Sequence, residues 1–346
     1  MGSQPAPGTV RPLKELVMDT PARIRIAAAA LATAVLAACA PGSTDPVADP
    51  AAAADYPQQD ITLTVVYPAG SAPDSTARTL AGELEKTLGT EVVVVNAEGG
   101  NGMVGLAQIM GEPADGYHIG FAASPPLTTS WQLIETSFRG PDSIQALAQT
   151  NEVPSVLFVN PQSGITTIEQ FVAAAKQRPL KVGVPGAASV QRFQLEEFLA
   201  AAGITVEQVI TDAGQQVLPT VNGTLDAAIA QPAPILQYVQ KGDLAMVGYF
   251  GDRPPEGLDV TPFAEAGYDI TWAGFEGFIA PKGVPDPILD RLDTAIEEAV
   301  HSAAFTEYTT TTHGVPAYVE RTAFQERMVN DVQIAKETIA RLGLGT

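Results

Sequence analysis

Short apolar runs alternate with stretches of helical periodicity along most of the chain. Residues 61–66 form one such run, and Leu80, Leu84 and Leu88 follow it at the spacing of one helix face. The pattern predicts a strand, a tight loop at residues 67–71 and a helix. Backbone N–H groups and the positive end of the helix dipole meet at a helix start, so this loop can hold an anion without Lys or Arg.

Two further units of strand, loop and helix follow. A β-branched run at 91–95 predicts a buried strand before the glycine-rich turn 96–102, and residues 118–122 predict a strand before a helix around 127–134. Three such units in a row predict a parallel sheet with helices on its faces. Ligands of such sheets lie at the carboxyl ends of the strands.

The same pattern recurs in the second half of the chain and predicts a second α/β domain. Its strands are expected at residues 153–160, 180–184, 206–210, 227–230 and 244–249, with helices between them. An extended aromatic segment at 272–281 then precedes an amphipathic helix at 285–300 and a final helix at 321–342.

The N-terminus has the pattern of a secretion signal. Arg23 and Arg25 precede an apolar segment at 26–38, which as a helix would span only about 20 Å, short of the roughly 30 Å hydrocarbon layer. Residues 1–38 are therefore predicted to be a signal peptide, with Met18 as an alternative start of translation. Residues 39–55, rich in Ala, Pro and Asp, are expected to form a flexible tether.

Small residues directly before Cys39 resemble the lipobox of bacterial lipoproteins. That resemblance implies lipidation of Cys39 and attachment to the outer face of the cytoplasmic membrane. The alternative is cleavage nearby to give a secreted protein without a lipid. No apolar run of membrane length follows Cys39, so the lipid would be the sole anchor.

Charge and cysteine content exclude several classes of protein. The 346 residues include 19 Lys and Arg against 39 Asp and Glu, a formal charge of −20. Nucleic-acid binding needs clustered cations and is not expected. Cys39 is the only cysteine, so the chain can form neither an internal disulfide nor a cysteine-based metal site.

Catalysis has little support in the sequence. His118, His301 and His313 lie far apart, and the motifs of serine hydrolases, zinc proteases and P-loop enzymes are missing. The glycine-rich turn at 96–102 lacks the G-x-G-x-x-G spacing of a dinucleotide site. We therefore predict a binding protein without cofactor or metal rather than an enzyme.

Three predicted loops, at 68–74, 124–127 and 186–191, would direct helix starts towards one cleft between the two domains. Gly70 and Gly186 allow close backbone approach, and serine hydroxyls add donors. Converging dipoles and N–H donors suit a small carboxylate. For any single loop an ordinary turn is the alternative, so the prediction rests on all three together.

Motifs spread over residues 56–340 resemble those of the tripartite tricarboxylate transporter substrate-binding proteins, also called Bug-type receptors. Six segments match in the family's order: 65–78 (P-x-G-x-x-x-D-x-x-A-R), 96–105 (N-x-x-G-x-x-G-x-x-G), 113–117 (P-D-G-Y), 159–161 (V-N-P), 223–226 (G-x-x-D) and 272–285 (W-x-G-x-x-A-P-x-G-x-P). The resemblance implies a two-lobed, periplasmic-binding-protein-like (Venus-flytrap) α/β fold, each lobe a mostly parallel sheet flanked by helices. Lobe 1 is expected at 56–157 and 275–346, and lobe 2 at 158–274.

The resemblance also implies a function and a site. Receptors of this family clamp a mono-, di- or tricarboxylate and deliver it to a membrane permease of one large and one small subunit; a monomer is expected. The implied ligand-binding residues are Tyr67, Pro68, Ala69, Gly70, Ser71, Asp74, Ser124, Pro125, Gly186, Ala188, Ser189, Arg192 and Gln231. Asp74 is expected to cap its own helix or to order water rather than to touch the anion.

The chain departs from the family's pattern at several of these positions. A run of glycines is common at 70–72, where this chain has Gly-Ser-Ala; Arg192 stands where a His is usual, and Gln231 where an Asp is frequent. Arg192 is open to two interpretations, a bidentate partner for a distal carboxylate or a solvated side chain in the first helical turn. Asp212 would repel an anion unless it pointed away or met a donor group on the ligand.

Two other functions are compatible with the sequence. A ligand-presenting partner of a sensor kinase would use the same cleft. A secreted hydrolase of carboxylate esters would need Ser71, Ser124 or Ser189 as its nucleophile. The sequence does not identify the carboxylate.

Overall fold

The computed structural model describes residues 55–344 apart from 187–188, 213, 256 and 271. The predicted signal peptide, Cys39 and the tether up to residue 54 lie outside the described residues, as does the candidate site residue Ala188. Within the described ranges, no helix is both long and apolar enough to cross a membrane.

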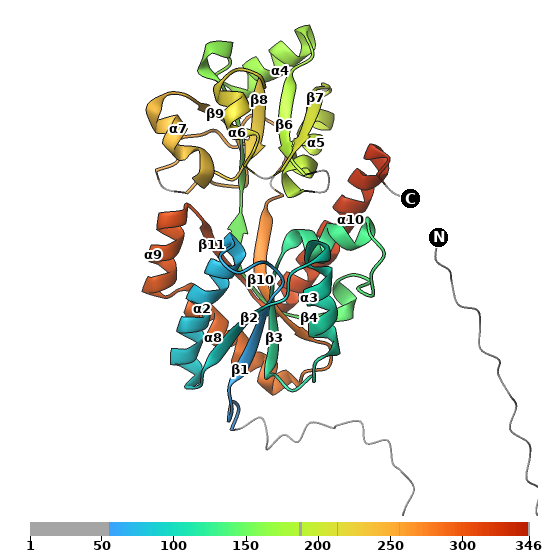
Figure 1. The fold of residues 1–346 in the computed structure, drawn as a ribbon, viewed down its shortest axis with the longest axis vertical. Helices are drawn as coiled ribbons and strands as arrows, with labels where there is room; N and C mark the ends of the chain where they lie inside the picture. Colours follow the sequence, from blue (N-terminus) through green and yellow to red (C-terminus); the bar gives the residue numbers. More distant parts are fainter. Residues whose placement is uncertain (1–54, 187–188, 213, 256, 271, 345–346) are drawn as a thin grey trace, which may run out of the picture. The chain divides into compact units, whose positions relative to one another are not determined.

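In the described part of the chain, the first sheet, sheet A, has six strands in the order β11-β4-β10-β3-β1-β2 (Figure 1). They are β1 (Ile61–Val65), β2 (Val92–Asn96), β3 (His118–Ala123), β4 (Ile144–Val153), β10 (Gly274–Pro281) and β11 (Val315–Val319). β1 pairs in parallel with β2 and β3, as the sequence predicts. β10 runs antiparallel between β3 and β4, and β11 antiparallel to β4, so sheet A is mixed rather than mostly parallel.

Helices cover both faces of sheet A. They are α2 (Ala72–Leu88), α3 (Met103–Gly111), α8 (Asp286–Val300), α9 (Ala303–Thr312) and α10 (Arg321–Leu342). α2 and α8 share a hydrophobic core with Phe121 on one face, whereas α3 and α10 share a core with Ala122 on the other. The alternation of side chains along β3 therefore fixes which helices each residue contacts.

The second sheet, sheet B, has five described strands in the order β7-β6-β8-β5-β9 (Figure 1). They are β5 (Ser155–Val159), β6 (Lys181–Pro185), β7 (Glu207–Thr211), β8 (Ala227–Ala230) and β9 (Ala245–Phe250). β6 is parallel to β7 and β8, while β5 is antiparallel to β8 and β9, so this sheet is also mixed. The two-lobed α/β fold is confirmed.

Sheet B is also covered on both faces. Its helices are α4 (Ile168–Gln177), α5 (Val190–Ala202), α6 (Val217–Val221) and α7 (Leu236–Lys241). Phe171 of α4 and Phe198 of α5 share one core, and Val217 of α6 packs in the core of the opposite face. Thr167 caps the start of α4, because its Oγ1 accepts a hydrogen bond from the Gln170 N–H.

The chain passes from sheet A to sheet B within a very short connection. β4 ends at Val153 and β5 begins at Ser155, and the chain returns to sheet A where β10 begins at Gly274. Sheet A is therefore built from two separate stretches of the sequence. β5 belongs wholly to sheet B although it begins before the predicted lobe boundary at 157/158, and the other predicted boundaries stay predictions.

Two local predictions are wrong for identifiable reasons. The helix expected at 127–134 is a π-helical turn (Pro125–Thr129) followed by a 3₁₀ turn (Ser130–Gln132). The Ser130 N–H donates to the Pro125 carbonyl, five residues earlier, which is the hydrogen bond of a π-helical turn, and Thr128 Oγ1 donates to the Ser124 carbonyl at 2.8 Å. The strand at β2 is not buried, because it lies at the edge of sheet A, where Val93 is 39% exposed.

Gly105 in α3 provides a test of the packing between α3 and sheet A. A Cβ at this position would lie 2.6 Å from the Ala97 carbonyl oxygen and 2.8 Å from Val66 Cγ1. Gly105→Ala should therefore lower the free energy of unfolding by about 1–3 kcal/mol, measured by urea denaturation.

Gly82→Ala is the matched control for this substitution. It also lies within a helix, α2, but a Cβ there would meet nothing within 4 Å. This change should raise the free energy of unfolding by about 0.5–1 kcal/mol through helix propensity alone. Equal stability of Gly105→Ala and the wild type would contradict the packing described for α3.

Candidate functional site

The connection between β1 and α2 is held by the carboxylate of Asp74, which is 2% exposed. Asp74 Oδ2 accepts hydrogen bonds from the Gly70 N–H at 2.8 Å and from Arg78 Nε at 3.0 Å, and Oδ1 accepts one from Asn96 Nδ2 at 2.8 Å. Asn96 Nδ2 also donates to the Tyr67 carbonyl at 3.0 Å. One buried side chain thereby fixes the start of α2 against the end of β2.

The role of Asp74 differs in detail from the predicted cap. Ser71 is the N-cap of α2, since its Oγ accepts the Asp74 N–H at 3.4 Å. Burial by itself would raise the pKa of Asp74, but hydrogen bonds from Arg78, Asn96 and the Gly70 N–H outweigh it and lower the pKa to about 2. The charged Asp74 carboxylate thus holds the loop between β1 and α2 in place through its hydrogen bonds.

A pocket of about 200 Å³, here called the interlobe pocket, lies between residues of sheet A and residues that follow strands of sheet B. Its lining from the sheet A side is Tyr67, Ala72, Pro73, Ala123, Ser124, Pro125, Val153, Gly274, Phe275 and Glu276, and from the sheet B side Val190, Gln191 and Gln231. The carboxyl ends of β1, β3 and β8 contribute to it, as expected for an α/β fold.

A second pocket of about 350 Å³, here called the α9 pocket, shares four residues with the first. The shared residues are Ala72, Val153, Gln231 and Glu276. Its remaining lining includes Thr76, Asn151, Glu152, Tyr308 and His313. The two pockets therefore meet at a common wall that includes Glu276.

Ser124 is the hydroxyl that the interlobe pocket leaves unsatisfied. It is 1% exposed, and its Oγ has no hydrogen-bond partner within the described residues. A buried hydroxyl without a partner costs free energy unless a ligand or water completes its hydrogen bonding. The sequence singled out this residue, and its position suits a ligand contact.

Two helix starts border the same pocket. Ala72 begins α2, and Val190 and Gln191 begin α5. Backbone N–H groups in the first turn of a helix have no intrahelical acceptor, so these amides can serve a ligand. The Asp74 and Arg192 amides are already bonded to Ser71 Oγ and Ser189 Oγ respectively.

Glu276 is the site residue that sequence reasoning missed. Its side chain is buried, with the residue 4% exposed, and its Oε2 accepts a hydrogen bond from Asn151 Nδ2 at 3.0 Å. Burial raises the pKa of its carboxyl group, while hydrogen bonds from Asn151 and Thr76 oppose that change. A single carboxylate in the otherwise uncharged run 272–281 was a usable signal.

The spacing of the last family motif also needs correction. Counted back from Pro285, W-x-G-x-x-A-P-x-G-x-P falls on Phe275, Gly277 and Ala280, not on Trp272. Phe275 therefore stands where the motif has Trp, and Glu276 occupies the variable position beside it.

Several predicted residues do not belong to the lining of either pocket. Pro68, Ala69 and Gly70 are exposed, and Ser71, Asp74, Gly186, Ser189 and Arg192 do not line either pocket among the described residues. Tyr67, Ser124, Pro125 and Gln231 do line the interlobe pocket. The structure thus brings four of the predicted residues together in one pocket, and Ala188 lies outside the described residues.

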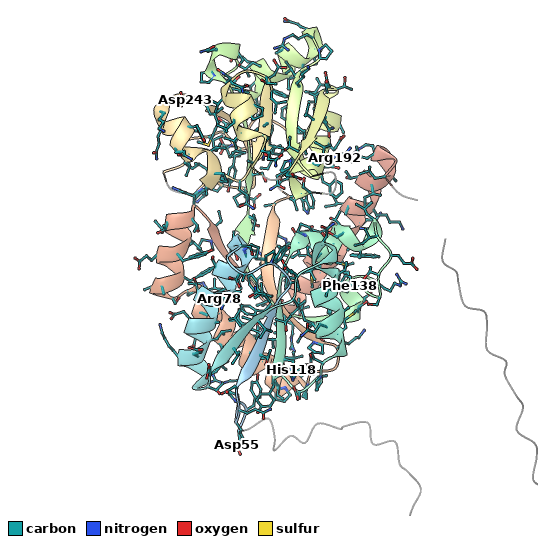
Figure 2. The ribbon with its side chains drawn as sticks, in the orientation of Figure 1. Asp55, Arg78, His118, Phe138, Arg192 and Asp243 are labelled. Carbon is teal, nitrogen blue, oxygen red and sulfur yellow. The ribbon has the colours of Figure 1, made fainter. Side chains whose placement is uncertain are left out.

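The sequence left open whether Arg192 and Asp212 face the ligand. Both side chains form hydrogen bonds within the protein. Arg192 lies on α5 (Figure 2), and its Nε donates to Gln208 Oε1 at 3.2 Å. Asp212 is exposed and accepts a hydrogen bond from Gln215 Nε2 at 3.1 Å. Neither residue lines the interlobe pocket.

Asp74→Asn tests whether the Asp74 carboxylate stabilises the loop between β1 and α2. Because the folded state lowers the pKa of Asp74, its charge stabilises the protein above the unfolded pKa of about 4, and that stabilisation is lost as the pH falls through about 2. The variant should lose about 2 kcal/mol of unfolding free energy at pH 7, and its deficit should shrink below pH 4.

Asp290→Asn is the control, because Asp290 forms an ion pair with Arg321 while its side chain is 68% exposed. Its stability should stay close to that of the wild type at every pH. Equal stability of Asp74→Asn and the wild type at pH 7 would contradict the proposed role of Asp74.

Comparison with known proteins gives consistent matches. A family model described as a tripartite tricarboxylate transporter family receptor matches residues 76–344. Protein BugT of Bordetella pertussis is 26% identical over 311 residues, which cover 87% of this chain and 95% of BugT. A crystal structure of a TctC solute-binding protein from Polaromonas, without ligand, has a TM-score of 0.76 at 25% identity and covers 83% of this chain and 99% of its own.

A structure of R. palustris Rpa4515 with adipate has the same fold, with a TM-score of 0.69 at 21% identity over 84% of this chain and 99% of its own. The matched proteins are solute-binding receptors, not enzymes. Because the family model spans well over half of the sequence, the chain belongs to the tripartite tricarboxylate transporter family of receptors.

Proposed function

We propose that this protein is an extracytoplasmic receptor that captures a small organic carboxylate in the interlobe pocket. The observation that carries the proposal is Ser124, a buried hydroxyl without a partner in the described residues, which faces the same pocket as the starts of α2 and α5. A carboxylate oxygen would complete the hydrogen bonding of that hydroxyl.

The chemistry of the lining favours this kind of ligand. The start of α5 offers the Val190 and Gln191 amides, and the start of α2 offers the Ala72 amide, since Pro73 has no N–H. Both starts also bring the positive end of a helix dipole. Among the described residues, neither pocket is lined by Lys or Arg, so dipoles and hydroxyls would have to balance a ligand's charge. Such a site would bind an anion without a strong ion pair and could release it readily.

The comparisons support the same ligand class. Rpa4515, which has the same fold, has been crystallised with adipate, a carboxylate. The family model describes receptors of tripartite tricarboxylate transporters. By that membership, a membrane permease of one large and one small subunit would receive the ligand, with the receptor acting as a monomer.

Ser124→Ala tests the placement of the carboxylate. A hydrogen bond to a charged group contributes about 1.5–3 kcal/mol, so the variant should bind its carboxylate about 10- to 100-fold more weakly. The ligand would first be found by thermal shift against mono-, di- and tricarboxylates, because binding to the native state raises the melting temperature. Isothermal titration calorimetry would then compare the variants.

Ser155→Ala provides the matched control. Ser155 Oγ is also buried and without a partner among the described residues, but Ser155 does not line either pocket. Its affinity should equal that of the wild type. Equal losses in both variants, or no thermal shift with any organic acid, would refute the proposed site.

The predicted lipobox, which lies outside the described residues, would attach the protein to the outer face of the cytoplasmic membrane. We expect Cys39 to carry lipid, so the wild type should incorporate a labelled fatty acid and partition into the detergent phase of a Triton X-114 extract. Cys39→Ser should lose the label and remain in the aqueous phase. A labelled Cys39→Ser variant would contradict lipidation at this cysteine.

A further inference from the structure

Glu276 is an unusual residue for a pocket that would bind an anion. It lines both the interlobe pocket and the α9 pocket, and it lies on β10 between β3 and β4. Its Cα partners across the sheet are Ala123 and Asn151. The sheet register therefore directs a carboxyl group into the site beside the unsatisfied hydroxyl of Ser124.

The described residues supply Glu276 with hydrogen bonds but with no ion pair. Asn151 Nδ2 donates to Oε2 at 3.0 Å, and Thr76 contributes a second hydrogen bond. The titratable groups beside it are the phenols of Tyr67 and Tyr308, whose pKa values burial and the charge of Glu276 both raise. A buried carboxylate without a counter-ion is costly, and a bound cation would remove that cost.

The other charged groups that the structure describes near the pockets are not counter-ions of Glu276. Glu152, which lines the α9 pocket, accepts from Arg327 Nη1 at 3.0 Å, so that guanidinium is already paired. Arg327 also donates to the Ala273 carbonyl and lies over the Phe275 ring. His313 is the one titratable base in the described lining of either pocket.

We infer that Glu276 selects a ligand that carries an amine as well as a carboxylate, and that it disfavours di- and tricarboxylates. The carboxylate would lie against Ser124 and the helix starts, and the ammonium group would lie against Glu276. A second carboxylate placed there would face Glu276 with no cation to offset the repulsion. This inference rests on the proposed function, since it assigns the second end of the same ligand.

The test is a set of matched ligands titrated into the purified protein at pH 8. The set comprises amino monocarboxylates of three to six carbons, with the amine at position two or at the chain end. Each is paired with the alkyl monocarboxylate that has a methyl group in place of the ammonium, and with the dicarboxylate of equal carbon number. Affinities are measured by calorimetry.

The wild type should bind one amino monocarboxylate at least about tenfold more tightly than both of its partners in the set, about 1.4 kcal/mol. Glu276→Gln should weaken binding of that amine about tenfold or more, and should leave the alkyl monocarboxylate nearly unchanged. Ser124→Ala should instead weaken both ligands by similar factors. The contrast separates the residue that binds the amine from the residue that binds the carboxylate.

The outcomes also separate this inference from the proposed function. A wild type that prefers dicarboxylates, with Glu276→Gln unchanged, would overturn the inference and leave a carboxylate receptor. Binding of no carboxylate of any class would overturn both. The wild-type comparison alone decides the preference for the amine if Glu276→Gln fails to fold.

Discussion

The carboxylate of Asp74 is the interaction on which the candidate site depends most. It holds the Gly70 amide, Asn96 and Arg78 at once, and Asn96 in turn holds the Tyr67 carbonyl. The loop that leads from β1 to α2 is thereby fixed at both ends, which places Tyr67, Ala72 and Pro73 in the pocket lining. The same interaction uses the Gly70 amide, so that donor serves the fold and not the ligand.

Because no Lys or Arg is in the described lining of the interlobe pocket, helix starts and hydroxyls would have to stabilise a bound anion. Helix starts and hydroxyls provide partial charges that are fixed in position, so they favour an anion without the full desolvation cost of a buried ion pair. The buried Glu276 carries the one carboxyl group in the described lining of the interlobe pocket, and in its charged form it opposes a second anionic group. Ser124 gives the pocket a hydrogen-bond donor for a carboxylate, and Glu276 gives it a carboxyl group that suits an ammonium group. We therefore infer a ligand that carries both a carboxylate and an amine.

The sequence predicts the elements around the site better than the site itself. The pattern along the sequence locates β8 and α10 to the residue, and it finds β1, β2 and β3, because such patterns are local in the chain. β4 and β11 escape prediction because their pairing with distant strands, rather than their own pattern, makes them strands. The segment after Ser124 forms a π-helical turn and a 3₁₀ turn in place of the predicted helix, a difference that apolar spacing alone does not reveal.

Some residues of the site can be predicted from the sequence, and others cannot. Tyr67, Ser124, Pro125 and Gln231 follow strands directly, so a rule about the carboxyl ends of strands finds them. Glu276 lies inside a strand, and only the antiparallel register of β10 between β3 and β4 shows that it reaches the pocket. Its Asn151 partner lies on β4, a strand that the sequence did not reveal, so their contact could not be predicted.

The central claim is that one carboxylate is held by two helix starts and a buried hydroxyl, away from any basic side chain. A crystal structure with a bound ligand tests it most directly. We expect carboxylate oxygens within about 2.7–3.2 Å of Ser124 Oγ and of the Val190 or Gln191 amide. A ligand carboxylate paired with Arg192, or bound outside the interlobe pocket, would contradict the account.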